Sequence, residues 1–328
     1  VCNVSASPFR AGVLSTRREM IATRSSDNQA TVVYANLVGA NDGLIFDGGG
    51  FINQNGRPIV EAARFREGLA CGIVDLDRTT RMRREASTWR TDLEDHRSTQ
   101  RPVRLLRLPE VAATEASRLA RKELGYPAPA AGSTFFLPSV RKPTTSARDE
   151  LLDDLYEALA LGVADYFRKT GAFKSLGLAL SGGRDSLLTL LIAHRAAQLV
   201  HSGLSEEEQR AVMPSFLHCF YMPTRYSSNA TADAARQIAQ DLGASFSVLS
   251  IEEAFDRELT ATRTMLAGAE PTELTKQNVQ ARIRGQRMWN WSNTSGALFL
   301  QTGNMSEKSL GYTTVGGDLE GALSVIAN

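Results

Sequence analysis

A short glycine-containing stretch in the middle of the chain constrains the fold more than any other part of the sequence. Leu176–Leu180 is brief and apolar, as buried strands are, and Ser186–Val200 carries apolar residues at helical spacing. The residues between them are Ser181, Gly182, Gly183, Arg184, Asp185 and Ser186. Two glycines permit a tight turn, and the first N–H groups of a helix have no partner within the helix. The pattern predicts a strand, a turn that binds phosphate, and a helix.

The side chains of this turn predict a chemistry that differs from that of a Walker A loop. A Walker A loop ends in Lys followed by Ser or Thr, whereas Arg184, Asp185 and Ser186 follow the glycines here. A carboxylate beside a phosphate repels it unless the carboxylate holds Mg²⁺. We therefore expect Asp185 to be a metal ligand. The alternative is a Gly-Gly turn in which Asp or Ser caps the helix and no ligand binds.

The stretch resembles the SGGxDS loop of the ATP pyrophosphatases. That superfamily includes NAD synthetases, GMP synthetases, asparagine synthetases and some tRNA-modifying enzymes. The resemblance implies that the loop 181–186 binds ATP, that ATP is cleaved between its α- and β-phosphates, and that Ser181 and Asp185 act in catalysis. The loop alone leaves the second substrate open.

Two later segments resemble NAD synthetases in particular. Residues 278–284 resemble the family's N-x-Q-A-R-x-R helix, and residues 302–318 resemble its T-G-N-x-S-E-x-x-x-G-Y-x-T-x-x-G-D signature. The resemblance implies that Thr302 contacts ATP and that Glu307 completes a Mg²⁺ site with Asp185. It also implies a site for deamido-NAD made by Asn278, Arg282, Glu307 and Asp318.

A further segment, 222–228, resembles the family sequence M-P-S-R-Y-S-S. This match implies that Arg225 and Tyr226 lie where they could contact the base or the phosphates of ATP. Ordinary turn residues are the alternative interpretation of the same segment. Val315 stands where the ammonia-only enzymes commonly carry Lys, so that contact is missing or replaced here.

The first hundred residues predict strands with one helix among them. Val1–Ser5 and Thr31–Val38 read as strands on either side of a charged helix, Ser15–Arg24. The Asn55-Gly56 pair is a strong hairpin signal, and Leu69–Leu76 is apolar enough to predict another strand.

The residues Asn3–Phe9, Asn36–Gly39 and Phe46–Gly49 resemble the later part of a nitrilase-type amidohydrolase domain. In glutamine-dependent NAD synthetases such a domain precedes the ATP pyrophosphatase domain. The resemblance implies that Ser7 contacts glutamine, and that the family's catalytic Glu, Lys and Cys belong before the matched segment. We interpret Cys2 as a structural core cysteine rather than a nucleophile.

The expected fold is α/β: the C-terminal part of a nitrilase-like α/β sandwich, then a doubly wound parallel-sheet ATP pyrophosphatase domain of the adenine nucleotide alpha hydrolase type. We expect a partial glutaminase domain at 1–100, a linker at 101–145 and a synthetase domain at 146–328. The chain begins with Val1 inside a strand and ends at Asn328 without a terminal helix. We therefore expect it to be truncated at both ends.

Composition excludes some classes of partner. The 328 residues include 37 basic and 36 acidic side chains, so the net charge of +1 does not favour nucleic acid or an anionic membrane. The three cysteines are widely spaced, as in reduced proteins, and neither a signal peptide nor a membrane span is apparent. These features predict a cytoplasmic protein, and the family resemblance implies a homo-oligomer.

The predicted function is therefore that of a ligase, a glutamine-hydrolysing NAD synthase. It would amidate deamido-NAD to NAD through a nicotinate adenylate, using ATP and Mg²⁺ and releasing AMP and pyrophosphate. Ammonia would come from glutamine in the full-length enzyme. The alternatives are another ATP pyrophosphatase amidotransferase, of the GMP synthetase kind, or a nucleotide-binding fragment without turnover.

Overall fold

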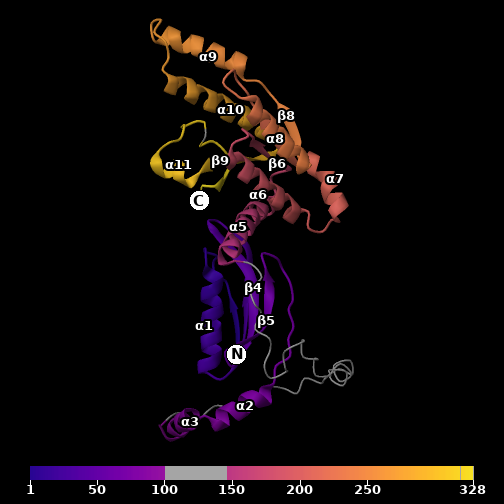
Figure 1. The fold of residues 1–328 in the computed structure, drawn as a ribbon, viewed down its shortest axis with the longest axis vertical. Coiled ribbons are helices and arrows are strands. Elements are labelled where there is room, and N and C mark those ends of the chain that lie inside the picture. The colour runs from indigo at the N-terminus through magenta and orange to yellow at the C-terminus, as the bar shows by residue number, and fades with distance from the viewer. Residues whose placement is uncertain (100–145, 318, 328) are drawn as a thin grey trace. The chain divides into compact units, whose positions relative to one another are not determined.

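The structure of the protein is a computed structural model that describes residues 1–99, 146–317 and 319–327. The chain divides into two compact units, each described here by itself. Unit 1 comprises Val1–Val38 and Phe46–Glu150, and unit 2 comprises Gly39–Ile45 and Leu151–Asn328. Figure 1 labels most of the helices and several of the strands of the two units. The predicted linker 101–145 and the predicted ligand residue Asp318 lie outside the described residues.

Residues 1–64 form a mixed five-stranded sheet with one long helix packed against it (Figure 1), and most of its strand β3 falls in the segment Gly39–Ile45 that is assigned to unit 2. The strands run in the order β1-β2-β4-β3, and β5 pairs with β4. Strands β1 and β2 are parallel, whereas β2 and β4, and β4 and β5, are antiparallel. The elements are β1 (Cys2–Ser5), α1 (Val13–Asp27), β2 (Thr31–Asn36), β3 (Val38–Asn41), β4 (Leu44–Gln54), β5 (Arg57–Arg64), α2 (Leu76–Glu85) and α3 (Ser87–Thr99).

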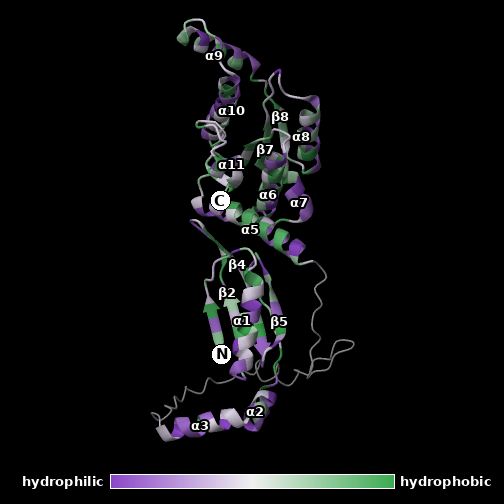
Figure 2. Ribbon diagram, turned by 60° about the vertical axis from the view of Figure 1, so that its left-hand side comes forward, coloured by the Kyte–Doolittle hydropathy of each residue, from purple (hydrophilic) through white to green (hydrophobic). Residues whose placement is uncertain are grey.

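The core of unit 1 lies between α1 and one face of this sheet. Leu14 and Ile21 of α1 pack with Val32, Tyr34 and Phe51 of the sheet. The predicted hairpin is confirmed, because β4 and β5 are joined at Asn55-Gly56. In Figure 2 the exposed helices α2 and α3 are largely hydrophilic, and none of the residues of α3 is buried.

Two sequence predictions about unit 1 are wrong. Leu69–Leu76 is not a strand: Leu69 is 91% exposed, and Asp75 accepts a hydrogen bond from the N–H of Arg78, which starts α2 at Leu76. Cys2 is exposed rather than in the core. It pairs with Val33 in the sheet register and so lies on the face opposite to that of Val32.

Unit 2 contains a second five-stranded sheet, in which every pair of neighbouring strands is parallel. The strand order is β10-β9-β6-β7-β8, so the order reverses between β6 and β9. The strands are β6 (Ser175–Ala179), β7 (Leu217–Tyr221), β8 (Ser245–Val248), β9 (Ala297–Asn304) and β10 (Leu323–Ile326). In open parallel sheets, ligands bind outside the carboxyl ends of the strands at such a reversal. The predicted α/β class with a parallel sheet is confirmed.

Helices cover both faces of this sheet. Along β9, Leu298 and Leu300 join a core cluster with residues of α5, α6, α7 and α8, whereas Phe299 joins a second cluster with residues of α9 and α10. This alternation is what a strand buried on both faces requires. The helices are α5 (Ala147–Thr170), α6 (Arg184–Val200), α7 (Glu206–Phe216), α8 (Asn229–Asp241), α9 (Glu252–Met265), α10 (Glu273–Ser295) and α11 (Met305–Leu310).

A glycine in β6 lets helix α10 pack closely against the sheet. A Cβ atom on Gly177 would lie 2.1 Å from the ring of Trp291, so only glycine leaves room for this side chain. Trp291 also contacts the ring of Phe220 edge-on, with ring centroids 4.8 Å apart.

Among the described residues, no helix is both long and apolar enough to cross a membrane.

Candidate functional site

The predicted phosphate loop joins β6 to α6, at one side of the strand-order reversal. Gly182 has φ of 82°, and a Cβ atom there would lie 2.2 Å from the carbonyl oxygen of Thr231. Any other residue at 182 would therefore be strained and would collide with the first turn of α8. Gly183 is the N-cap of α6, and Asp185 lies in the first turn of that helix.

Two serines fix the shape of the loop. The Ser181 hydroxyl accepts a hydrogen bond from the N–H of Gly183 at 3.2 Å and lies 3.0 Å from the Ser186 hydroxyl. Ser186 donates to the carbonyl of Gly183 at 2.9 Å and is almost fully buried. These bonds hold the loop in one conformation, so it does not have to be ordered when an anion binds.

The junction between β9 and α11 meets the phosphate loop through one asparagine. The side-chain amide of Asn304 donates to Asp185 Oδ2 at 3.3 Å. The same residue is the N-cap of α11: its Oδ1 accepts from the N–H of Glu307 at 2.9 Å, and its own N–H donates to Glu307 Oε2 at 3.1 Å. Asn304 thus contacts both carboxylates that were predicted to share a metal.

These carboxylates fit a Mg²⁺ site of the kind that nucleotide phosphates complete. Mg²⁺ is usually held by one or two carboxylates together with phosphate oxygens and water, rather than by a full set of protein ligands. Asp185 and Glu307 supply two carboxylates beside a loop suited to phosphate. No cluster of three or more metal-binding side chains occurs among the residues that the structure describes.

A small cavity adjoins the phosphate loop between the ends of β6 and β7. Its volume is about 100 Å³. Its walls are mostly apolar and include Ala179, Leu180, Phe220 and Met222, with Arg284 of α10 at one side. A flat apolar ring fits such walls, and a guanidinium group stacks well on an aromatic face.

Arg225 does not face this loop as a free cation. Its side chain makes ion pairs with Glu252 and Asp256 of α9. Its main-chain N–H also donates a hydrogen bond to Glu252 at 2.7 Å. The hydrogen bond with Glu252 and the charge of Asp256 raise the pKa of Arg225 above its ordinary value. Tyr226 is 61% exposed and packs edge-on against Phe255, with ring centroids 6.2 Å apart.

The predicted dinucleotide residues of α10 lie against the loop that follows α11. Asn278 Oδ1 accepts a hydrogen bond from the Thr314 hydroxyl at 2.8 Å, and Arg282 Nε donates to the carbonyl of Val315 at 3.1 Å. Thr302 is half-buried in β9 and lies three residues before Met305, the first residue of α11. The structure therefore links the phosphate loop to the end of β9 through Asn304, and links helix α10 to residues 314–315.

Comparison with known families identifies this arrangement. The profile of the NAD synthase family matches residues 155–328, which is more than half of the chain. The chain belongs to the NAD synthase family. The matched part begins in α5 and contains residues 181–186, 302–307 and 314–315.

Known proteins with this domain extend the similarity over nearly the whole chain. The glutamine-dependent NAD(+) synthetase of Thermotoga maritima is 32% identical over 327 residues, which is 99% of this chain and 49% of that protein. The enzyme of the same name from Aquifex aeolicus is 30% identical over 99% of this chain and 50% of its own length. The chain therefore spans about half the length of the curated relatives that it matches.

A solved structure has the same fold as this NAD synthase family member. It is the glutamine-dependent NAD+ synthetase of Acinetobacter baumannii in complex with ADP, with a TM-score of 0.70 and 26% identity. The match covers 100% of this chain and 48% of that one.

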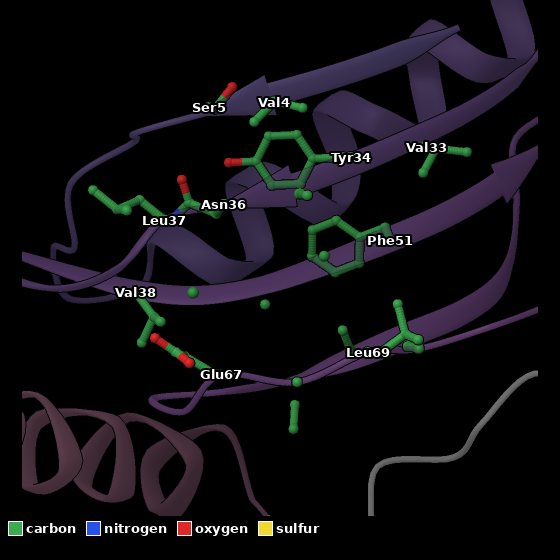
Figure 3. Close-up of a pocket in the computed structure, with 18 of the residues that line it drawn as sticks. Val4, Ser5, Val33, Tyr34, Asn36, Leu37, Val38, Phe51, Glu67 and Leu69 are labelled. Carbon is green, nitrogen blue, oxygen red and sulfur yellow. The ribbon is translucent and has the colours of Figure 1, made fainter.

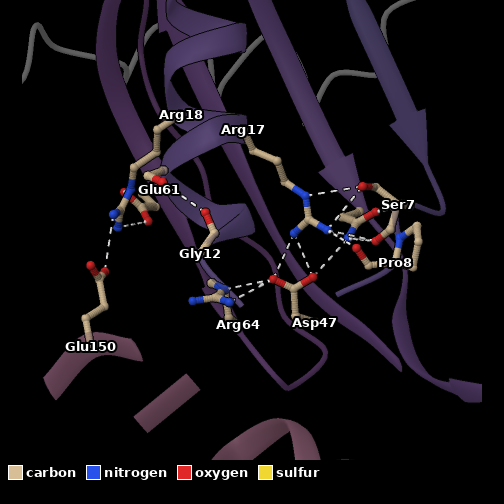
Figure 4. A network of polar contacts seen from close by, with 11 residues as sticks. Ser7, Pro8, Gly12, Arg17, Arg18, Asp47, Glu61, Arg64 and Glu150 are labelled. Atoms are coloured by element: carbon tan, nitrogen blue, oxygen red, sulfur yellow. Dashed lines mark hydrogen bonds and ion pairs between the residues drawn. The ribbon is translucent and has the colours of Figure 1, made fainter. Parts of the chain in front are cut away.

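Ser7, the residue predicted to contact glutamine, lies in unit 1 within a buried ionic network (Figure 4). Arg17 makes two hydrogen bonds to Asp47, at 2.6 and 2.8 Å, and Arg64 approaches the same carboxylate at 2.9 Å. Arg17 also donates to the Ser7 hydroxyl at 3.1 Å and to its carbonyl at 2.8 Å. Asn36 holds the main chain of Ser7 from the other side.

A second cavity lies on the sheet of unit 1, around the exposed residues Val4 and Val33. Its volume is about 800 Å³, and Figure 3 shows Val4, Val33, Leu37 and Leu69 among the residues that line it. Val4 is 87% exposed. The lining of the cavity is mostly apolar, and the predicted ligand residues of unit 2 do not contribute to it.

Sequence reasoning missed the role of Asn304 in this NAD synthase domain. A signal for it was present, because Asn followed three residues later by Glu is the spacing of a capping box at a helix start. The hydrogen bond from Asn304 to Asp185 could not be inferred from spacing, since 119 residues separate the two.

Proposed function

We propose that this chain carries out the ATP-dependent amidation of deamido-NAD to NAD. The observation that carries the proposal is the contact of Asp185 and Glu307 with one residue, Asn304, beside the phosphate loop and at the strand-order reversal. Membership of the NAD synthase family favours this reaction over that of another ATP pyrophosphatase.

The proposed chemistry needs an activated carboxylate. An oxygen of the nicotinate carboxylate attacks the α-phosphorus of ATP, the bond from that phosphorus to the bridging oxygen breaks, and pyrophosphate leaves. Ammonia then attacks the carbonyl carbon of the adenylate, loses a proton, and displaces AMP to give the amide. Donors placed where charge develops stabilise both steps.

The residues of the phosphate loop supply such donors. The first-turn N–H groups of α6 bind the phosphates, and the dipole of α6 favours their negative charge. We assign ATP to Ser181, Gly182, Gly183, Arg184, Asp185, Ser186 and Thr302. The adenine ring would occupy the apolar cavity lined by Met222 and Arg284.

A magnesium ion bound by Asp185 and Glu307 would neutralise phosphate charge when present. Deamido-NAD would lie along Asn278, Arg282 and Glu307, with Asp318 at the nicotinate end. Asn278 and Arg282 support this assignment because they anchor residues 314–315 of the loop that follows α11.

Glutamine is the proposed source of ammonia in longer relatives, with Ser7 as a contact for it. The Ser7 hydroxyl oxygen already accepts from Arg17, so Ser7 would act as a donor to the substrate. A homo-oligomeric state and a cytoplasmic location stay predictions.

The test is to incubate the chain with ATP, Mg²⁺, deamido-NAD and ammonium and to measure NAD by chromatography. We expect NAD to form and to require all four components, and we expect Asp185→Asn to abolish it. Saturable ATP binding without NAD formation would instead favour the nucleotide-binding fragment.

A further inference from the structure

Helix α10 holds two separate loops through two pairs of polar side chains. The first pair, Asn278 and Arg282, binds the loop 314–315 as described above. In the second pair, Gln280 Oε1 accepts a hydrogen bond from the Thr224 hydroxyl at 2.8 Å, and Arg284 Nε donates to the carbonyl of Met222 at 3.1 Å. Each pair has the spacing of four residues that places two side chains on one face of a helix.

The two pairs lie on different sides of the helix. At 3.6 residues per turn, a step of two residues rotates a side chain by about 200° around the axis. Between the pairs, Val279 and Ile283 are buried in the core cluster that contains Phe255 and Phe299. The helix is therefore fixed to the sheet along the same turns that carry the polar contacts.

Each loop is organised around the threonine that α10 binds. Thr224 is 7% exposed, its N–H donates to the Ser227 hydroxyl at 3.1 Å, and its carbonyl accepts from the N–H of Ser227 at 2.9 Å. Thr314 is 8% exposed, and its carbonyl accepts from the N–H of Gly317 at 3.0 Å. A buried hydroxyl that loses its partner costs more than an exposed one, so each loop depends on its bond to α10.

We propose that Gln280 is a positioning residue, and that α10 sets the conformations of the loops 223–227 and 312–317 together, so that order in one stabilises the other. The inference rests on the proposed function for its ligands, because Met222, Ser227 and Arg284 line the proposed adenine cavity and Thr314 lies beside the proposed dinucleotide site. ATP would then bind more tightly when deamido-NAD is present, and the reverse must hold to the same degree.

Amide hydrogen exchange on the ligand-free 328-residue chain tests the clamp itself. Gln280→Met keeps the length of the side chain and removes the acceptor, whereas Gln280→Glu keeps the acceptor. Gln286→Met makes the same change at an exposed position of the same helix. We expect Gln280→Met to speed exchange in both loops by about threefold to tenfold, which is the range for losing the hydrogen bond with Thr224, and we expect the two controls to match the wild type.

The reciprocal variant makes the test sharper. Thr314→Val should speed exchange in 223–227 as well as in its own loop, and Thr224→Val combined with Gln280→Met should add nothing to either change alone. If each variant affected only the loop that it touches, α10 would not join the loops and the proposal would be wrong.

Calorimetry with a non-hydrolysable ATP analogue and deamido-NAD separates this proposal from the proposed function. We expect each ligand to strengthen the binding of the other in the wild type. In Gln280→Met, the ratio of a ligand's affinities with and without the other ligand should fall to near one. A wild type that bound neither ligand but showed coupled exchange would contradict the proposed function alone. A wild type whose ligands bind independently would overturn the coupling.

Discussion

Asn304 donates a hydrogen bond of 3.3 Å to Asp185, although 119 residues separate them in the chain. The bond joins the carboxyl end of β9 to the first turn of α6, on the two sides of the reversal in strand order. Because Asn304 also caps α11, one side chain sets the positions of Asp185 and Glu307 relative to each other. Asn304 therefore has two roles, the contact with Asp185 and the cap of α11. A suitable substitution can remove the first role and keep the second.

Asn304→Asp should preserve the cap of α11 and lower ATP binding. Aspartate caps a helix as well as asparagine does, but it cannot donate to Asp185 and adds a like charge. A hydrogen bond to a charged group contributes about 1.5–3 kcal/mol, so we expect a loss of about tenfold or more in ATP affinity by calorimetry. Asn304→Ala, which also removes the cap, should lose about 1 kcal/mol of stability in addition. Wild-type ATP affinity in Asn304→Asp would contradict this role.

Gly182→Ala should disrupt the phosphate loop. The added Cβ would lie 2.2 Å from the Thr231 carbonyl oxygen, and alanine is strained at a φ of 82°. We expect a loss of more than about 1 kcal/mol in the free energy of unfolding and the loss of ATP binding. Gly203→Ala is the control, because a Cβ atom at Gly203 meets nothing within 4 Å. Equal effects of the two substitutions would rule out the close approach of α8 to the loop.

Asp47→Asn should destabilise unit 1 severely. The Asp47 side chain is fully buried and balances Arg17, so its neutralisation leaves a buried guanidinium without a counter-charge. We expect a loss of about 3–5 kcal/mol, measured by urea unfolding. Glu61→Gln breaks the pair with the half-exposed Arg18 and should cost at most about 1 kcal/mol. If Asp47→Asn cost no more than Glu61→Gln, the buried network would contribute little to the fold.

The three cysteines should differ sharply in reactivity. Burial raises the pKa of the Cys219 thiol to about 12, so this group is neutral at pH 8, whereas Cys2 and Cys71 are exposed. Titration of the native chain with Ellman's reagent should therefore detect two rapidly reacting thiols, and the third only after denaturation. The Cys2→Ser and Cys71→Ser variants should each lose one rapid thiol. Three rapid thiols in the native chain would contradict the packing of β7.

Local patterns in the sequence predicted the elements around the site well. The apolar residues before Ser181 and the helical spacing after Ser186 located β6 and α6, because a buried strand and an amphipathic helix each have a distinct period. The same reasoning gave a wrong prediction for Leu69–Leu76, because Asp75 caps a helix that starts at Leu76. Short apolar runs do not distinguish a buried strand from an exposed connection.

Contacts between distant residues could not be predicted in this way. The sequence left Arg225 either as a contact for ATP or as an ordinary turn residue, and only the packing of α9 shows that Glu252 and Asp256 hold it. The bond between Thr224 and Gln280 spans 56 residues and likewise depends on how α10 lies on the sheet. A periodicity in sequence fixes which face of a helix a residue occupies, whereas its partner depends on the tertiary fold.

The identity of the nucleotide released from ATP tests the central claim most directly. The chain is incubated with ATP labelled at the α-phosphorus, Mg²⁺, deamido-NAD and ammonium, and the labelled products are separated by chromatography. We predict labelled AMP in an amount equal to the NAD formed, with no AMP above background from Asp185→Asn. Labelled ADP, or NAD formed without AMP, would contradict cleavage between the α- and β-phosphates at this loop.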